Sequence, residues 1–228
     1  MREIFPSFDN RKHRNQNRNV HIKWVDKTSR TLEQLVQKNE LDFAVCLDSD
    51  PQKTVFSNRI IHSDPVYLCV SEKLLQQHYG EETKALKKKA INGAAVNDFI
   101  RLPFLMPESE NRLGKVISEC FSQENLAPLV RVQTTYTSIL MPLCNAGLAA
   151  GFTSKMNLKE WISLFAEDVN IFPLYCNGSP VTQTVHVIYN KQRYLNRYTR
   201  YFLDLLEEYF QEIAQQDLTR LAPTLNSI

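Results

Sequence analysis

The feature that most constrains the fold is a run, LDFAVCL (41–47), that is apolar except for Asp42 and directly follows a helical pattern. In the preceding segment, KTSRTLEQLVQKNE (27–40), apolar residues recur at the spacing of one helical face. A strand that is apolar on both faces is expected to be a parallel strand covered on both sides. Before the helix, NVHIKWV (19–25) alternates apolar and polar residues as a strand does. The three segments together predict a βαβ unit and a layered α/β fold.

The rest of the chain continues the alternation of strands and helices. Further strands are expected at 66–70, 102–106, 129–132, 170–175 and 185–189, and helices at 111–121, 140–147 and 198–213. The last strand and helix follow a second block of mixed elements, as they would if the chain left one lobe, built another and returned. We therefore expect a first lobe made of 1–70 plus 185–228 and a second lobe made of 71–184.

Composition places the chain among ordinary globular proteins. Of the 228 residues, 43% are hydrophobic and 23% are charged, and the net charge of +2 is too small to mark a nucleic-acid-binding surface. The five cysteines lie far apart without a CxxC pair, which predicts free thiols in a reducing compartment. Residues 1–18 contain no apolar segment of the length of a signal peptide or a membrane span. We therefore expect a cytoplasmic protein.

A run of five hydroxyl-bearing residues, TTYTS (134–138), directly precedes a helical pattern. The N-terminus of a helix exposes unpaired N–H groups and carries a partial positive charge. Ser and Thr at this position either cap the helix or offer donors to a polar or anionic ligand. Thr28 and Ser29 repeat the arrangement before the first helix. The pattern thus predicts two plain helix caps or two facing halves of a small-molecule site.

Enzymatic and metal-binding motifs do not appear in the sequence. It contains no GxSxG, HExxH or GxGxxG, and its five histidines are scattered. We expect no catalytic residues, no metal and no cofactor. The basic runs 11–18 and 84–89 lack interleaved aromatic residues and are interpreted as solvated helix faces. Arg112, at the start of a helix after Pro107, is either a bidentate donor to an acidic ligand or a surface arginine. Pro142 is expected to kink the helix that follows the hydroxyl run.

The segment VHIKWVDKTSRTLEQLVQKNELDFAVCL (20–47) resembles the effector-binding domain of LysR-type transcriptional regulators. Further segments match in the order that the family shows: DPVYLCVSEKLL (64–75), LPFLMPESENRLGKVISECFSQENLAP (102–128), CNAGLAAGFTSK (144–155) and VHVIYNKQRYLNRYTRYFLDLL (185–206). The resemblance implies an α/β fold like that of the type 2 periplasmic binding proteins. In that fold, two Rossmann-like lobes are joined by crossover strands.

The resemblance also implies a function. The chain would be a ligand-sensing regulatory domain that binds a small polar or anionic metabolite between its lobes and forms a homodimer or homotetramer. The predicted effector-binding residues are Thr28, Ser29, Arg112, Thr134, Thr135, Tyr136, Thr137 and Phe152. The family's winged helix-turn-helix has no counterpart in this sequence, so contact with DNA is expected only through such a domain, and none with a membrane. The alternative is a free-standing solute-binding protein of the same fold.

Overall fold

A computed structural model describes residues 22–48, 55–161 and 168–215. The chain forms two compact units, which meet along the sequence at Ser63–Asp64 and at Gln183–Thr184. Unit 1 contains the described residues before and after these two points, and unit 2 contains those between them. The first boundary lies inside β2 (Phe56–Ser71), because this strand runs for 16 residues where the sequence predicted only 66–70.

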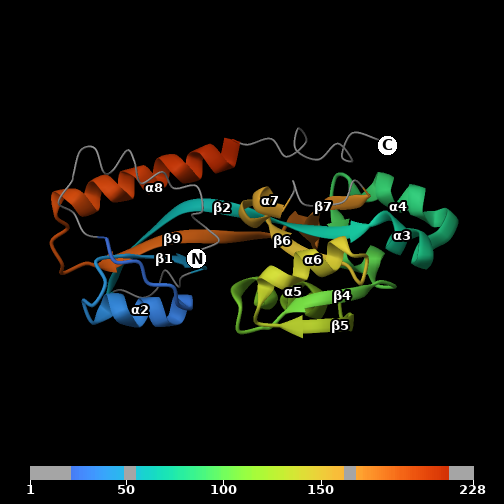
Figure 1. The fold of residues 1–228 in the computed structure, drawn as a ribbon, viewed down its shortest axis with the longest axis horizontal. Helices are drawn as coiled ribbons and strands as arrows, with labels where there is room; N and C mark the ends of the chain where they lie inside the picture. The colour runs from blue at the N-terminus through green and yellow to red at the C-terminus, as the bar shows by residue number, and fades with distance from the viewer. Residues whose placement is uncertain (1–21, 49–54, 162–167, 216–228) are drawn as a thin grey trace. The chain divides into compact units, whose positions relative to one another are not determined.

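Unit 1 is built on a sheet in the order β1–β9–β2, with β1 at Ala44–Leu47 and β9 at Thr182–Asn190. The helix α2 (Ser29–Gln37) covers one face of this sheet, and α8 (Arg197–Gln215) covers the other (Figure 1). The apolar run at 41–47 is therefore covered on both sides, as predicted. No parallel partner of β1 is found among the described residues, and β1 pairs with β9 in antiparallel orientation.

The two helices of unit 1 are amphipathic, as the sequence predicted. In α2, Leu32 and Val36 are buried against Cys46, Phe56 and Ile188 of the sheet. In α8, buried residues recur every three or four positions: Phe202, Leu206, Phe210 and Ile213. The Phe202 ring contacts that of Phe43 at 5.6 Å, and the Phe210 ring stacks on that of His62 at 5.6 Å. In both helices, apolar residues at helical spacing thus form the face that packs on the sheet.

The prediction of a strand at 19–25 is wrong for residues 22–25, which the structure describes. Residues 22–28 adopt no strand, and Ile22 and Trp24 are 38% and 44% exposed. Residues 19–21 lie outside the described part of the chain. An alternating pattern forms a strand only where a partner strand can pair with it and a core can cover its apolar face. The expected βαβ unit is accordingly not formed by the described residues.

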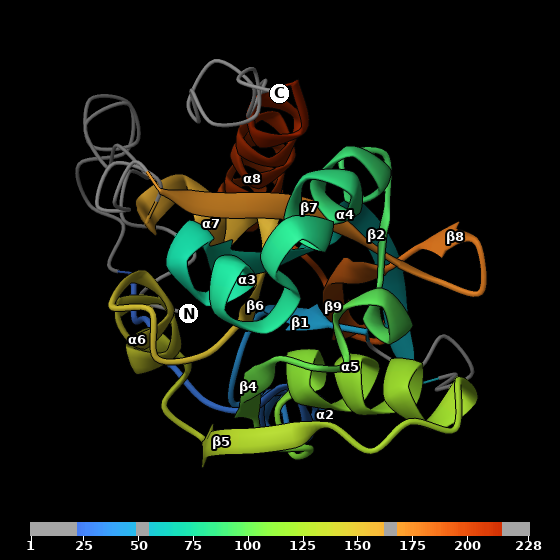
Figure 2. The same cartoon turned by 90° about the vertical axis from the view of Figure 1, so that its right-hand side faces the viewer.

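Unit 2 contains β2 flanked by two antiparallel strands, β6 (Gly151–Ser154) and β7 (Val169–Cys176) (Figure 2). β3 (Ala94–Ala95) extends β7 in parallel, and β8 (Ser179–Pro180) pairs with it across the turn at Asn177 and Gly178. The helices are α3 (Glu72–Tyr79), α4 (Thr83–Ala90), α5 (Arg112–Gln123), α6 (Leu140–Asn145) and α7 (Lys155–Trp161). The described residues of the unit also form 3₁₀ helices at η1 (Gly80–Glu82), η2 (Val96–Phe99) and η3 (Thr137–Ile139).

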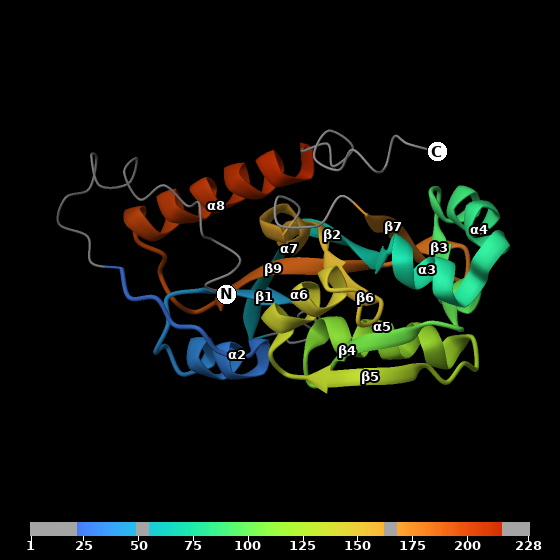
Figure 3. The ribbon, with the colours of Figure 1, turned by 45° about the vertical axis from the view of Figure 1, so that its right-hand side comes forward.

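A separate parallel pair, β4 (Pro103–Pro107) and β5 (Leu129–Thr134), lies beside α5 in unit 2 (Figure 3). Its connection through α5 makes a βαβ arrangement from the strands expected at 102–106 and 129–132 and the helix expected at 111–121. The kink expected at Pro142 is not needed, since α6 begins at Leu140 and Pro142 falls in its first turn. A first-turn N–H has no partner within the helix, so a proline is tolerated there.

Candidate functional site

In unit 1, the two predicted hydroxyls at the start of α2 have different structural roles. Thr28 is the N-cap, and its Oγ1 accepts a hydrogen bond from the Thr31 amide at 3.4 Å. Ser29 is the first helical residue, and its Oγ accepts from the Leu47 amide at the end of β1, at 3.2 Å. Each oxygen acts as an acceptor in these contacts. The Ser29 hydroxyl therefore keeps its proton to donate, at the positive end of a nine-residue helix.

A polar network lies at the same end of β1 and was not predicted. Asp48 Oδ1 accepts from the Thr184 amide at 2.7 Å and from the Thr184 hydroxyl at 2.9 Å. The Thr184 hydroxyl is 2.7 Å from Nε2 of His186, whose Nδ1 is 2.6 Å from Asn58 Oδ1. Asp48, Thr184, His186 and Asn58 thus join β1, β9 and β2. Thr184 and His186 share the α2 side of β9 with Ile188, because side chains alternate along a strand.

The hydrogen bonds of this network place a proton on Nε2 of His186 and leave the state of Nδ1 open. The Thr184 hydroxyl donates to Asp48, so it accepts from Nε2–H of His186. With Asn58 Oδ1 facing Nδ1, the ring must carry a second proton and is an imidazolium. With the Asn58 amide turned over, its NH₂ group donates to Nδ1 and the ring is neutral. The network therefore accommodates His186 in either charge state by one amide rotation.

In unit 2, the hydroxyl run follows β5 rather than capping α6. The Thr134 hydroxyl accepts from the Tyr136 amide at 3.0 Å and closes a tight turn. Thr135 and Tyr136 are exposed, the latter by 72%, and Thr137 begins η3. No side chain caps α6, whose N-cap position is Ile139. The capping interpretation thus holds for Thr28 but not for the run at 134–138.

Arg112 is brought to the same edge of unit 2 as the hydroxyl run. β4 and β5 are parallel, with Pro107 opposite Thr134, so the segments that follow them begin side by side. The Glu108 amide donates to the Thr134 carbonyl at 3.1 Å, and Asn111 caps α5 directly before Arg112. The expected start of a helix at this arginine is confirmed.

Gly114 lets the first turn of α5 approach this edge. A Cβ at this position would lie 2.2 Å from the Glu108 carbonyl oxygen and 2.5 Å from that of Pro107. Only a residue without a side chain permits so close a backbone approach. The position of Arg112 relative to Thr134 therefore depends on a glycine two residues away.

Phe152 occupies a different environment from the other predicted residues. Its side chain is 2% exposed, stacks on Phe104 at 5.7 Å and meets the edge of Phe121 at 6.3 Å. It belongs to the main core of unit 2. The structure thus gives Phe152 a packing role and offers no ligand-facing surface for it.

The described residues form neither a cluster of metal-ligating side chains nor a membrane-spanning helix. They contain no group of three or more His, Cys, Asp and Glu side chains arranged to hold a metal ion. None of the described helices combines the length and apolarity required to cross a bilayer. All five cysteines carry free thiols, and four of them are buried.

Comparisons with known proteins agree with this architecture. The sequence profile described as "LysR substrate binding domain" matches residues 11–211. A search of curated protein sequences finds no match. The effector binding domain of BenM with its effector benzoate superposes with a TM-score of 0.69 at 12% identity, covering 94% of this chain and 89% of that one.

Two further solved structures are similar to the same degree. The regulatory domain of CcmR from Synechocystis PCC6803, in complex with 2-PG, gives a TM-score of 0.67 at 15% identity, with 92% and 94% of the two chains covered. The C-terminal domain of a probable LysR family transcriptional regulator from Rhodococcus sp. RHA1 gives 0.65 at 14% identity, with 89% and 91% covered. The expected fold is confirmed.

Proposed function

This chain belongs to the LysR substrate binding domain family, and we propose that it senses a small polar or anionic metabolite through the start of α2 and the hydroxyl run after β5. Domains of this family are the regulatory parts of DNA-binding transcriptional regulators, and this assignment is favoured over a free-standing solute-binding protein. BenM and CcmR are described with benzoate and 2-PG, both bound by domains of this fold.

One observation carries the choice of ligand class: both segments offer hydrogen-bond donors. Ser29 and Thr134 each use their hydroxyl oxygen to accept a backbone N–H, which leaves the hydroxyl proton for a ligand. The N-terminus of α2 adds a partial positive charge, and Arg112 adds a full one at the edge of unit 2. Donors and positive charge favour a ligand rich in acceptor oxygens, such as a carboxylate or a phosphate.

The proposed mechanism is binding without catalysis. A ligand that prefers one arrangement of the protein shifts the equilibrium toward it by the difference between its two affinities. No covalent step is required. We further propose that the protein acts in the cytoplasm as a homodimer or homotetramer and reaches DNA only through a separate helix-turn-helix domain. Light scattering on the purified protein measures the oligomeric state directly.

The test is a thermal-shift screen of carboxylates, sugar phosphates, amino acids and bases, including shikimate, 2-PG and benzoate. A ligand present at about 100 times its Kd stabilises by roughly 2.7 kcal/mol, which raises the melting temperature of a chain of this size by about 5–10 °C. The Kd of each hit is then measured by calorimetry for the unmodified protein, Ser29→Ala, Thr135→Ala and the exposed control Ser122→Ala. We expect the first two variants to bind about 10-fold more weakly and the control to bind normally. A selective ligand whose Kd is the same in all four proteins would contradict the proposed site.

A further inference from the structure

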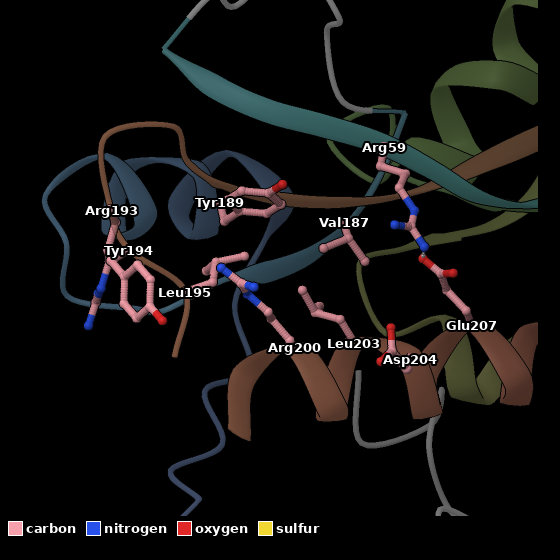
Figure 4. A pocket seen from close by; sticks show the side chains of 10 residues that line it. All are labelled: Arg59, Val187, Tyr189, Arg193, Tyr194, Leu195, Arg200, Leu203, Asp204 and Glu207. Carbon is pink, nitrogen blue, oxygen red and sulfur yellow. Dashed lines mark ion pairs between the residues drawn. The ribbon is translucent and has the colours of Figure 1, made fainter. Parts of the chain in front are cut away.

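A groove in unit 1 lies on the opposite side of the sheet from Ser29. Its cavity volume is about 510 Å³, within the range of sites that hold small ligands (Figure 4). Val187 and Tyr189 of β9 line it, whereas Ile188 between them packs toward α2. Because neighbouring side chains of a strand point to opposite faces, the groove lies on the α8 side of the sheet. It is thus separate from the site proposed above.

The other wall is formed by one edge of α8. Arg200, Leu203 and Glu207 recur at helical spacing and line the groove, beside the buried stripe that packs on the sheet. Val187, Leu195 and Leu203 supply apolar surface, and Figure 4 shows the Val187 and Leu203 side chains facing each other across the groove. The groove therefore combines apolar surface on both of its walls with charged side chains.

Most charges in the groove are already paired. Arg59 forms an ion pair with Glu207. Arg193 pairs with Asp42 at 2.6 Å and donates to the Asn39 and Leu41 carbonyls, each at 3.2 Å. Each of the two guanidinium groups therefore has a carboxylate partner, and that of Arg193 is also held by two backbone carbonyls.

Arg200 is different from the other two arginines of the groove. Its guanidinium lies over the Tyr194 ring, 5.5 Å from the ring centre, and no carboxylate among the described residues pairs with it. Stacking on an aromatic ring orients the planar group and leaves its N–H edges available. An oriented guanidinium without an acid partner is suited to bind a carboxylate through two hydrogen bonds.

We propose that this groove binds a small organic carboxylate with an apolar body, as a second ligand site of the domain. The carboxylate pairs with Arg200, and the apolar body lies on Val187 and Leu203. Asp204, one helical turn beyond Arg200, also lines the groove and carries a charge that opposes an anion. The proposal rests on unit 1 alone and does not depend on the site at Ser29.

The test uses three probes that share one body and differ in charge: 3-phenylpropanoate, its neutral amide and 3-phenylpropylamine. Calorimetry and amide chemical shifts of the intact chain give the Kd and the location of each. We expect the carboxylate to bind about 10-fold more tightly than the amide, and Arg200→Gln to remove this difference. The matched control is Arg197→Gln, an exposed arginine on the same helix that does not line the groove.

Two more variants make the outcome specific to the groove. Asp204→Asn is expected to tighten carboxylate binding by about 2- to 5-fold, because it removes the opposing charge. Leu203→Trp, which places a larger side chain between the two walls, is expected to abolish binding of both the carboxylate and the amide. Tighter binding of the amine than of the carboxylate, an unchanged Kd in Arg200→Gln, or a carboxylate Kd weaker than about 10 mM would overturn the proposal.

Discussion

The buried carboxyl group of Asp64 makes the stability of unit 2 depend on pH. Asp64 is 2% exposed, at the start of the unit 2 part of β2. Its Oδ1 accepts from the Met156 amide at 3.0 Å, within the first turn of α7. Burial raises the pKa of Asp64 from 3.8 to about 6, and hydrogen bonds from Ser154 and Met156 and the charge of Lys155 oppose the rise only in part.

The sign and size of the effect follow from linkage. Because the folded state holds this proton more tightly than the unfolded state does, the contribution of Asp64 to stability is fully present below about pH 4 and is lost as the pH rises through 6. A rise of about two pKa units corresponds to roughly 3 kcal/mol. The amide of an Asp64→Asn variant keeps an acceptor for the Met156 amide but has no proton to exchange. The difference in unfolding free energy between the two proteins should therefore change by roughly 3 kcal/mol between about pH 3 and pH 7.

Urea unfolding of both proteins at a series of pH values measures this difference, and groups common to the two cancel in the subtraction. Carbon-detected NMR of the Asp64 carboxyl group gives the pKa directly, with about 6 expected. Parallel stability curves for the two proteins, or an NMR pKa near 4, would refute the reasoning. The exposed variant Ser122→Ala serves as the control, because it removes no titratable group and its stability curve should run parallel to that of the unmodified protein.

Two further predictions concern packing in unit 2. Gly114→Ala should destabilise the protein by about 2 kcal/mol or more, because the new methyl group would meet two backbone carbonyl oxygens. The better helix propensity of alanine is too small to offset this clash. The control Lys115→Ala, exposed on the same turn, should have little effect on the unfolding free energy in the same urea titration. Phe152→Ala should cost about 3–5 kcal/mol through the cavity it leaves, whereas Tyr136→Ala should stay within about 0.5 kcal/mol; equal effects would contradict a core role for Phe152.

Several elements of unit 2, among them β4, α5 and β5, could be predicted from the sequence because each of these is marked by its own residues. The strand expected at 102–106 and the helix expected at 111–121 are found at Pro103–Pro107 and Arg112–Gln123. The parallel pairing of β4 with β5 then brings Arg112 to the hydroxyl run, as a helix connection between two parallel strands requires. Local periodicity and short connections were sufficient here.

Other features depend on contacts between distant parts of the chain and were not predictable. Whether β1 pairs in parallel or antiparallel orientation depends on β9, which lies more than 130 residues away. The network of Asp48, Thr184 and His186 joins the same distant strands, so no single segment displays it. Two weaker signals were available: a carboxylate directly after a buried strand, and polar residues at alternate positions of an otherwise apolar strand. Both indicate a polar cluster on one face of a sheet.

The sequence left open whether the hydroxyls at this helix start have a structural role or serve a ligand, and at Ser29 the two roles are not exclusive. A hydroxyl has two lone pairs and one proton, so an oxygen that accepts the Leu47 amide can still donate to a ligand. Ser29→Ala should therefore lower both the affinity for the effector and the stability of unit 1, the latter by about 1 kcal/mol. The exposed Thr135 hydroxyl makes no hydrogen bond within the described residues, so Thr135→Ala should lower affinity alone. Measuring both quantities in both variants separates a structural hydroxyl from one kept for a ligand. A Thr135→Ala variant that loses stability but not affinity would assign the hydroxyl run to the fold rather than to the site.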